Sequence, residues 1–424
     1  MVIHIVGAGL AGSEVAWQLV KRGIKVTIHE MKKIKKSPVH TSDNFAELVC
    51  SNSLKSVELK NAEGLLKAEI ELWDSLILNC ANEHKVPAGK ALAVDREKFS
   101  QCVTNKLLET GLVNVVWEEV EKPTEEGIWV IASGPTTEGK LAEWIISQTG
   151  NFFNFFDAVS PIISADSINM NICFFGDRYG VGTSDYINCP MNKEEYEQFW
   201  EELVNSQVLE IEDFDRKLLF ERCQPIEEIA KSGKDAMRYG PLRPVGLVDP
   251  RTGKEPYAVV QLRKENLEGT MYNIVGFQTR LKWGEQKRII RMIPGLENAE
   301  ILRYGVMHRN SYIDSPKVLD GFLRLKTNNK IFFAGQITGV EGYVESTMTG
   351  MYVGINIARF INNKEMIKFP EKTMCGALIK YITTAVELKP MYANFGLLGG
   401  GKNREQIAFR ALEEMKKFHD QYEI

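Results

Sequence analysis

The sequence predicts an α/β fold in which a Rossmann-type domain is interrupted by an inserted α+β domain. Three observations support this prediction. The chain has 424 residues, more than one hydrophobic core usually accommodates. It opens with a strand, a glycine-rich turn and a helix, and a second strand–glycine–helix unit follows near its end. Because both glycine-rich units have to meet at one ligand, we expect residues 1–155 and 301–424 to form one domain, with the insert at 156–300.

The opening residues contain a dinucleotide-binding fingerprint. "VIHIV" (2–6) has the pattern of a buried strand, "GAGLAG" follows, "SEVAWQLVKRG" has the pattern of a helix, and "KVTIHE" is a second strand that ends at Glu30. In this pattern the first glycine allows the tight turn, the second lets the backbone approach a pyrophosphate, and the third lets the helix pack on the strand. The helix N-terminus then faces the phosphate charge. We predict that the dinucleotide binds to Glu30, through the ribose hydroxyls, and to Gly7, Ala8, Gly9, Leu10, Ala11 and Gly12.

Two later stretches favour FAD over NAD as the dinucleotide. "GIWVIASGP" (127–135) is a strand that breaks into small residues, as where a flavoprotein chain returns to its cofactor. "NKIFFAGQITGVEGYVESTMTGMYVGINIAR" (329–359) contains a strand, a glycine-rich turn and a long helix. A unit of this kind near the end of the chain, paired with one at the start, is typical of proteins that hold FAD. The residues predicted to contact FAD here are Ser133, Gly134, Gly335, Gln336, Gly342 and Tyr343.

Bulk composition is that of an ordinary soluble protein. The chain is 44% hydrophobic and 25% charged, and no run approaches the roughly 18 apolar residues of a membrane span. No secretion signal opens the sequence, so we expect a cytoplasmic protein without membrane association. The seven cysteines include no CxxC pair, which argues against a disulfide framework and against a metal site. A formal net charge of −4 does not suggest extensive nucleic-acid binding, but it leaves room for a local basic face.

Several motifs resemble one family. "FFAGQITGVEGYVESTMTGMYVGINIAR", "SPIISADSINM", "RMIPGLENAEILRYGVMHRNSYI" and the opening fingerprint resemble the glucose-inhibited-division-like flavoproteins that modify tRNA uridines. Within that group, "ELVCSNSLKS", "FERCQPIEEIA", "MRYGPLRPVGL" and "YAVVQLRKEN" resemble the folate/FAD-dependent tRNA (uracil-5-)-methyltransferases (TrmFO). The resemblance covers nearly the whole chain. It implies methylation of C5 of the T-loop uridine in tRNA, with the carbon from 5,10-methylenetetrahydrofolate and the electrons from NAD(P)H through FAD.

The chemistry of that reaction requires a thiolate that adds to C6 of uracil and a base that removes the C5 proton. The resemblance assigns these two roles to Cys50 and Cys223. Cys50 lies beyond the second strand of the fingerprint, in a loop expected to reach the flavin. Cys223 follows Arg222, whose charge favours a thiolate, at the expected end of a helix. Which cysteine is the nucleophile is left open, and we favour Cys50.

Other residues of these motifs are candidates for substrate binding. His308, beside Arg309, is a candidate to stack on the folate pterin, and Tyr343 and Glu345 either line the same pocket or fix the turn. Arg238 and Arg263 are candidate phosphate contacts, although solvated surface charge is an equally good interpretation. The aromatic spacing of "NKEEYEQFWEELVNS" favours core packing over a base-stacking platform.

Three alternatives stay open at this stage. Three glycines, "GGG" at 399–401, stand where we expect prolines in this family, so ribosomal RNA is an alternative substrate. The same FAD domain also serves wobble-uridine modification, which needs a GTPase partner, whereas no obligate protein partner is inferred here. A flavin-bound RNA chaperone or scaffold is the non-enzymatic alternative.

Overall fold

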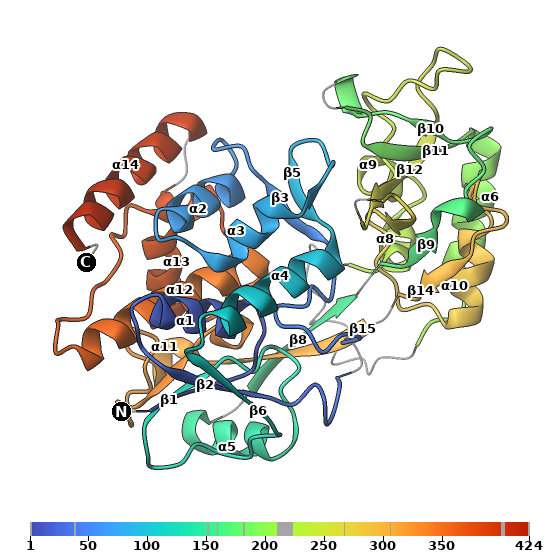
Figure 1. Cartoon of the computed structure of the whole chain (residues 1–424). Helices are drawn as coiled ribbons and strands as arrows, with labels where there is room; N and C mark the ends of the chain where they lie inside the picture. Colours follow the sequence, from blue (N-terminus) through green and yellow to red (C-terminus); the bar gives the residue numbers. More distant parts are fainter. Residues whose placement is uncertain are drawn as a thin grey trace.

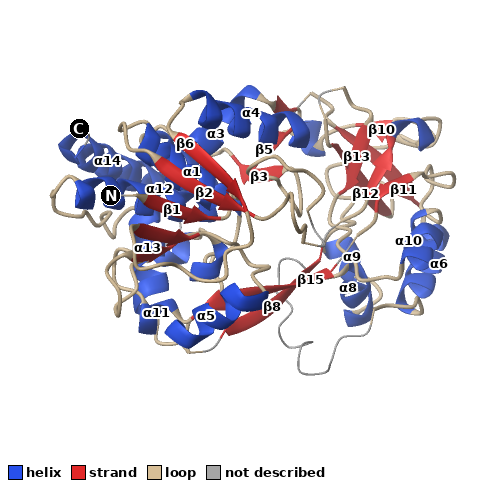
Figure 2. Cartoon of the chain, turned by 60° about the horizontal axis from the view of Figure 1, so that its bottom comes forward, coloured by secondary structure: helices blue, strands red, loops and turns tan. Residues whose placement is uncertain are grey.

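The computed structural model describes residues 2–37, 40–150, 152–158, 160–180, 183–209, 224–266, 268–305, 307–399 and 403–422, with the backbone alone over 152–158 and 307–309. Cys223 therefore lies outside the described residues. The chain forms two sheet-based units, which Figures 1 and 2 show beside one another: a Rossmann domain (described residues of 2–150 and 310–422) and an insert domain (described residues of 160–305).

A five-stranded parallel sheet forms the centre of the Rossmann domain, in the order β16-β7-β1-β2-β6. Its strands are β1 (Ile3–Val6), β2 (Val26–Glu30), β6 (Val113–Trp117), β7 (Ile128–Ile131) and β16 (Ile331–Phe333). β16 comes from the C-terminal stretch of the chain and pairs with β7 from the N-terminal stretch, so both glycine-rich units belong to one sheet as the α/β prediction requires. The turns after β1, β7 and β16 all leave the same edge of the sheet, where ligands of such folds bind.

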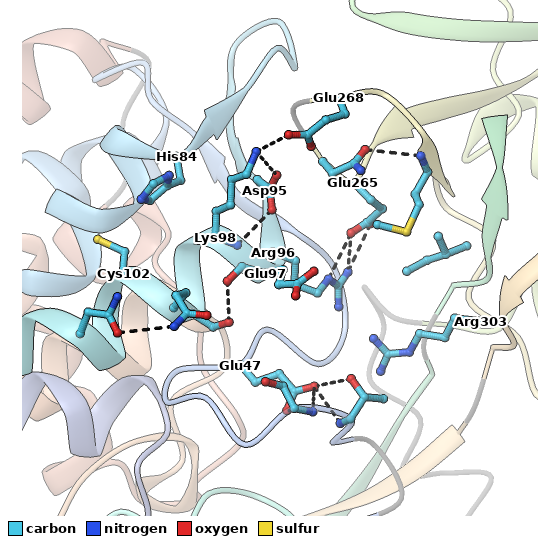
Figure 3. A pocket seen from close by; sticks show the side chains of 18 of the residues that line it. Glu47, His84, Asp95, Arg96, Glu97, Lys98, Cys102, Glu265, Glu268 and Arg303 are labelled. Carbon is cyan, nitrogen blue, oxygen red and sulfur yellow. Dashed lines mark hydrogen bonds and ion pairs between the residues drawn. The ribbon is translucent and has the colours of Figure 1, made fainter. Parts of the chain in front are cut away.

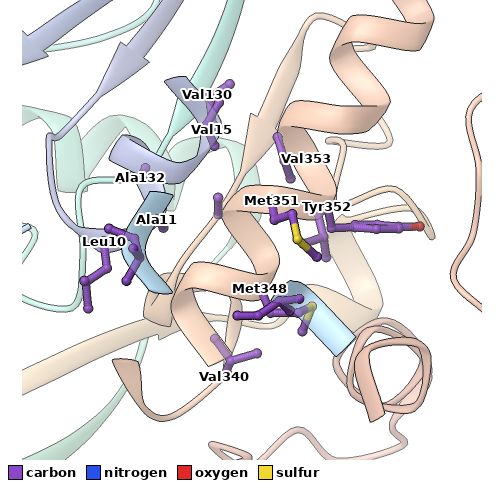
Figure 4. Packing of buried hydrophobic residues seen from close by; sticks show 14 of the residues in the cluster. Leu10, Ala11, Val15, Val130, Ala132, Val340, Met348, Met351, Tyr352 and Val353 are labelled. Atoms are coloured by element: carbon purple, nitrogen blue, oxygen red, sulfur yellow. The ribbon is translucent and has the colours of Figure 1, made fainter. Parts of the chain in front are cut away.

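Helices α1 (Leu10–Val20) and α12 (Tyr343–Ile361) pack against each other behind this edge. Two glycines of α12 allow the close contact: a Cβ on Gly350 would lie 2.3 Å from the Ala11 carbonyl oxygen, and one on Gly354 would lie 2.7 Å from Gln18 Cβ. Figure 4 shows Met348, Met351 and Val353 of α12 in the surrounding apolar core. The rigid α1–α12 pair thereby fixes the position of both glycine-rich turns.

Further helices and a small sheet complete the Rossmann domain. The sheet has the order β3-β5-β4 and consists of β3 (Ser53–Ser56), β4 (Lys85–Val86) and β5 (Ala91–Val94). The helices are α2 (Ala62–Glu71), α3 (Leu76–Glu83), α4 (Arg96–Glu109), α5 (Gly139–Thr149), α11 (Ser315–Val318), α13 (Met374–Thr384) and α14 (Arg404–Tyr422). None of the described helices is both long enough and apolar enough to cross a membrane.

The insert domain contains a six-stranded sheet in the order β10-β11-β12-β13-β9-β14, whose pairings are all antiparallel. Its strands are β9 (Ile162–Ser164), β10 (Phe174–Phe175), β11 (Tyr186–Met191), β12 (Ala258–Lys264), β13 (Met271–Ile274) and β14 (Ile301–Arg303), and its helices are α6 (Lys193–Val204), α8 (Ile226–Ser232), α9 (Ala236–Tyr239) and α10 (Trp283–Ile290). β14 belongs to this sheet although it follows the predicted boundary at residue 300. Tyr196 and Phe199 of α6 are fully buried, which confirms that the aromatic spacing serves core packing.

An antiparallel ribbon of β8 (Phe152–Ala158) and β15 (Met307–Ile313) connects the two domains. The chain therefore leaves the Rossmann domain and returns to it along paired strands (Figure 1). The two domains are therefore joined by a pair of hydrogen-bonded strands.

One buried cation near this edge makes stability depend on pH. The Nζ of Lys67 on α2 donates a hydrogen bond to the Leu54 carbonyl oxygen at 2.7 Å, and burial lowers the pKa of Lys67 to about 8. In the unfolded chain a lysine titrates near pH 10.4, so the unfolded state holds this proton more tightly. The contribution of Lys67 to the free energy of unfolding should therefore rise as the pH increases from about 8 to about 10. Denaturant unfolding tests this: the free energy of unfolding of the natural protein minus that of Lys67→Met should be larger at about pH 9.5 than at about pH 7.5, and an equal difference at the two pH values would contradict the prediction.

Candidate active site

The edge where β1, β7 and β16 end opens into a cavity, here called the dinucleotide cavity. Its lining includes ten of the thirteen residues predicted to bind the cofactor: Gly7, Gly9, Leu10, Ala11, Glu30, Ser133, Gly134, Gly335, Gln336 and Tyr343. The other three support it from behind. Ala8 is buried, Gly12 packs against Gly7, and Gly342 is the N-cap of α12. Segments from both ends of the chain thus form one concave site.

The first glycine-rich turn leaves space for a phosphate group. A Cβ on Gly9 would meet no atom within 4 Å, whereas one on Gly12 would lie 1.9 Å from the Gly7 carbonyl oxygen. Gly9 therefore faces the cavity, and Gly12 faces the strand. Gly7 has φ +96°, a conformation that favours glycine. Together with the N-terminus of α1, this geometry fits a pyrophosphate at Gly9.

The Glu30 carboxylate lies at the end of β2 and organises the same turn. Its Oε2 accepts a hydrogen bond from the Ala8 backbone N–H at 2.7 Å, and its Oε1 accepts one from the Lys32 N–H at 3.0 Å. Both contacts hold the carboxylate at the cavity wall, where ribose hydroxyls are expected to bind. Lys32 begins the basic run "KKIKK" (32–36), for which the sequence favours a solvated loop. In the structure Lys32 is instead buried, lines the cavity and donates through Nζ to the Asn44 carbonyl oxygen. Burial lowers the pKa of Lys32.

Tyr343 connects the dinucleotide cavity to Cys50. The tyrosine begins α12, and its hydroxyl oxygen accepts hydrogen bonds from the backbone N–H of Cys50 at 2.7 Å and of Ser51 at 3.1 Å. Burial raises the pKa of Tyr343, so its hydroxyl stays neutral at physiological pH. Cys50 is half-buried, and Val49, next to it, lines the cavity. The Cys50 loop (residues 47–52) is therefore positioned by the same helix that forms the cavity wall.

Arginines from outside the loop bind its carbonyl groups. Arg96, the first residue of α4, donates to the Leu48 carbonyl oxygen and forms a two-point ion pair with Glu265 of the insert domain, at 3.1 and 3.2 Å. Arg303 of β14 donates to the Val49 carbonyl oxygen at 3.0 Å. Sequence reasoning missed both arginines, because one arginine at a helix start and one in a strand give no distinctive signal.

Asn52 ties the loop to the insert sheet. Its Nδ2 donates to the carbonyl oxygens of Val94 and Lys264, at 2.9 and 2.7 Å, and its Oδ1 accepts from Arg263 Nε at 3.0 Å. Asn52 is fully buried, and Arg263 is 8% exposed. Arg263, expected to contact RNA phosphates, therefore donates a hydrogen bond to Asn52 in the protein interior. A buried charge without a partner would be costly there. The insert domain and the Cys50 loop share one hydrogen-bond network.

The remaining predicted residues take different positions. The Cζ of Arg238 lies 3.5 Å from the centre of the Tyr257 ring, and its Nη1 forms an ion pair with Asp235 Oδ1 at 2.9 Å. The contacts of Arg238 are therefore local to the insert domain. Glu345 is buried and accepts from the Ala393 N–H at 2.9 Å, which fixes the turn at the start of α12. His308 and Arg309 lie in β15 opposite Asp157 and Phe156 of β8.

A second, larger cavity of about 1130 Å³ lies between α4 and the insert domain, and we call it the interdomain cavity. Figure 3 shows its charged lining, with Arg96 beside Glu265 and Lys98 beside Glu268. Glu47 and Arg303 also line it, so one side of the interdomain cavity adjoins the Cys50 loop. The loop therefore lies between two cavities, one on the Rossmann side and one on the insert side.

Removing the Tyr343 hydroxyl should loosen the Cys50 loop without emptying the dinucleotide cavity. Tyr343→Phe deletes the acceptor of two backbone hydrogen bonds, each worth about 1 kcal/mol. We expect the turnover of any reaction that uses the Cys50 thiol to fall roughly tenfold, while flavin content stays unchanged. Flavin absorbance and steady-state rates test this, with Tyr381→Phe on α13 as a control that removes a hydroxyl away from the loop. Equal losses in both variants would contradict the prediction.

The fold and the dinucleotide cavity define a dinucleotide-binding protein of the Rossmann type. The profile of the family described as "Glucose inhibited division protein A" matches residues 2–365. Two solved structures of Aquifex aeolicus GidA have the same fold, with TM-scores of 0.74 and 0.73 at 16% and 15% identity; the alignments cover 99% of this chain and 73% and 75% of those chains. At that identity, the likeness concerns the fold.

Sequence relatives are more specific. Two relatives are named "Methylenetetrahydrofolate--tRNA-(uracil-5-)-methyltransferase TrmFO". The one from Fervidobacterium nodosum is 81% identical to this chain, and the alignment covers 98% of this chain and 97% of the relative. The one from Thermosipho melanesiensis is 66% identical, and the alignment covers 99% of each chain. The relative of that name in Thermotoga maritima is 60% identical, over 99% of each chain. The chain belongs to the TrmFO family within the GidA group.

Proposed function

We propose that this protein methylates C5 of the T-loop uridine in tRNA, with 5,10-methylenetetrahydrofolate as the one-carbon donor and NAD(P)H as the reductant. One observation carries the proposal: the loop that holds Cys50 is fixed by Tyr343, a residue that lines the dinucleotide cavity. A thiol for the pyrimidine and a cavity for a redox cofactor are thereby combined in one site.

FAD is the cofactor of the dinucleotide cavity, and when bound it supplies hydride chemistry. The residues present fit it, because Gly9 leaves room for the pyrophosphate and Glu30 faces the expected ribose. Backbone N–H groups of Ala8 and Lys32 fix the orientation of the Glu30 carboxylate at the cavity wall.

Cys50 is the proposed nucleophile. Its sulfur adds to C6 of uracil, which makes C5 nucleophilic toward the one-carbon unit, and a base then removes the C5 proton. The carbonyl groups before Cys50 are bound by Arg96 and Arg303, and the N–H of Cys50 itself is bound by Tyr343. Tyr343 also accepts a hydrogen bond from the Ser51 N–H, so the loop is restricted on both sides of the thiol, which holds the sulfur near its reacting position. The family resemblance gives the two roles to Cys50 and Cys223 without dividing them, and with Cys50 as the nucleophile we propose Cys223 as the base.

A methylation assay with mapped products tests the proposal. Purified protein is incubated with bulk tRNA that lacks the modification and, separately, with ribosomal RNA, in the presence of methylenetetrahydrofolate and NAD(P)H. We expect 5-methyluridine in the tRNA T-loop only when both co-substrates are present. If 5-methyluridine forms in ribosomal RNA alone, the substrate is ribosomal RNA and not tRNA. If the modified nucleoside is the wobble uridine of tRNA, the reaction is a different one. If neither RNA is modified while a control enzyme is active, the proposal is wrong.

A further inference from the structure

The end of α3 and the facing side of α4 bring together four side chains of types that bind transition metals. Cys80, Glu83 and His84 are spaced i, i+3 and i+4, so they share one face at the C-terminus of α3. Cys102 comes from α4, and its Sγ lies 2.7 Å from Cys80 Sγ and 3.5 Å from Glu83 Oε2. The donor atoms of Glu83, His84 and Cys102 all lie within 4.8 Å of one another. Figure 3 shows His84 and Cys102 together at one end of the interdomain cavity.

We propose that these four residues, here called the α3–α4 cluster, bind one divalent transition-metal ion of the zinc type. Two sulfurs, an imidazole nitrogen and a carboxylate oxygen form a set that suits tetrahedral Zn²⁺. In such a site the bonds are about 2.0–2.3 Å long, so neighbouring donors lie roughly 3.3–3.8 Å apart. To reach that arrangement the two sulfurs, now 2.7 Å apart, have to separate, and the Cys80 sulfur has to turn toward the group formed by Glu83, His84 and Cys102.

The local charges balance such an ion. Two thiolates and one carboxylate around a dication leave one negative charge, and Lys106 of α4 already forms an ion pair with Glu83. The carbonyl end of α3 adds a partial negative charge that favours a cation. Because thiolates are the ligands, binding of the ion releases the protons of the two thiols.

Access and surroundings also fit a bound ion. His84 and Cys102 line the interdomain cavity, whereas Cys80 is fully buried beneath them, so an ion can arrive from one side and be enclosed from the other. Among the residues that the structure describes, Glu83, His84 and Cys102 form the only such group of three. The ion would join α3 to α4, the helix whose first residue, Arg96, binds the Cys50 loop.

The sequence had argued against a metal site, because no two cysteines have a CxxC spacing. Cys80 and Cys102 lie 22 residues apart, on separate helices. Only the packing of α3 on α4 brings them together, so local spacing carries no signal of the cluster. A second close pair, Cys173 and Cys189 in the insert domain at 3.4 Å, offers a matched control, since it belongs to no such group among the described residues.

Metal analysis of the full-length protein tests the proposal. Protein purified without a metal-affinity tag is loaded with Zn²⁺, dialysed and measured by elemental analysis, with Co²⁺ as a spectroscopic probe of thiolate coordination. We expect about one ion per chain and a cobalt–thiolate charge-transfer band. His84→Ala and Cys102→Ser should each weaken metal binding at least about tenfold, while Cys173→Ser should leave it unchanged. His84 is only half-buried, so its variant should fold, which retained flavin content would verify.

Three outcomes would overturn the proposal. Full metal retention in both cluster variants would place the ion elsewhere. The natural protein could also be metal-free and have two reactive thiols fewer than expected. If a reducing agent restores these thiols and a chelator does not, Cys80 and Cys102 form a disulfide instead. Absence of both metal and thiol loss would leave the four side chains as plain core and surface residues, which also contradicts the proposal.

Discussion

Cys50→Ala should abolish methylation while leaving the flavin bound. The thiol is the proposed nucleophile, and loss of a nucleophile lowers turnover by on the order of 10⁴-fold or more in other covalent enzymes. The variant deletes only a half-buried sulfur, and the loop keeps the backbone hydrogen bonds that Tyr343 and Arg303 make. We therefore expect normal flavin absorbance, a normal unfolding midpoint and no detectable 5-methyluridine.

RNA that contains 5-fluorouridine separates a nucleophile from a base. Fluorine replaces the C5 proton that a base has to remove, so the covalent bond at C6 persists once a nucleophile has added. We expect the natural protein to form a gel-stable adduct and Cys50→Ala to form none, because it cannot add at all. Cys173→Ala, which removes a buried thiol of the insert core, should behave like the natural protein. Adduct formation by Cys50→Ala would assign the nucleophile to another residue.

Gly9→Ala should lower the affinity for FAD, whereas Gly12→Ala should lower the stability of the fold. The Cβ added at Gly9 meets no protein atom within 4 Å, so the apoprotein should keep its stability, but the methyl group occupies space needed by the pyrophosphate. We expect FAD affinity to fall roughly tenfold or more, about 1.4 kcal/mol or above. The Cβ added at Gly12 would lie 1.9 Å from the Gly7 carbonyl oxygen, so α1 would have to move from β1. That variant should lose roughly 3 kcal/mol or more of stability.

Denaturant unfolding of the apoproteins and titration with FAD distinguish the two effects. Gly284→Ala on α10 is a suitable control, because its Cβ also meets no atom within 4 Å and it lies in the insert domain, away from the dinucleotide cavity. It should leave FAD affinity unchanged and raise stability by no more than about 1 kcal/mol, as alanine does in place of glycine in a helix. If Gly9→Ala binds FAD as tightly as the control, the pyrophosphate does not approach Gly9, and the proposed orientation of the cofactor is wrong.

The dinucleotide cavity was the most predictable part of the molecule. Its signals are local: a glycine spacing of a few residues, a strand before it, a helix after it and Glu30 at the next strand end. Each signal reports a backbone requirement that neighbouring residues alone satisfy. For the same reason Tyr343 and Gln336, which follow a similar local pattern, were predicted at positions where the structure places them in the cavity lining.

The surroundings of Cys50 could not be predicted in this way. Arg96, Arg303 and Asn52 gain their roles only because the insert sheet packs beside the loop, at sequence separations of up to 254 residues. Arg263 shows the converse error, since a charged residue in a family motif was expected at the RNA surface and instead donates to Asn52 in the interior. Charge in a sequence indicates that a partner is needed, but it does not indicate which partner.

The sequence by itself determined the α/β class, the split Rossmann domain and the glycine turns, because each follows from periodicity and spacing over short stretches, and the candidate thiol followed from the family resemblance. Only the tertiary structure decided that Cys50 is held by Tyr343 and by arginines from α4 and β14, and that Cys80 and Cys102 come into contact. The physical reason is that hydrogen bonds and sulfur contacts act over a few ångströms in space, and the packing of helices and sheets sets those distances.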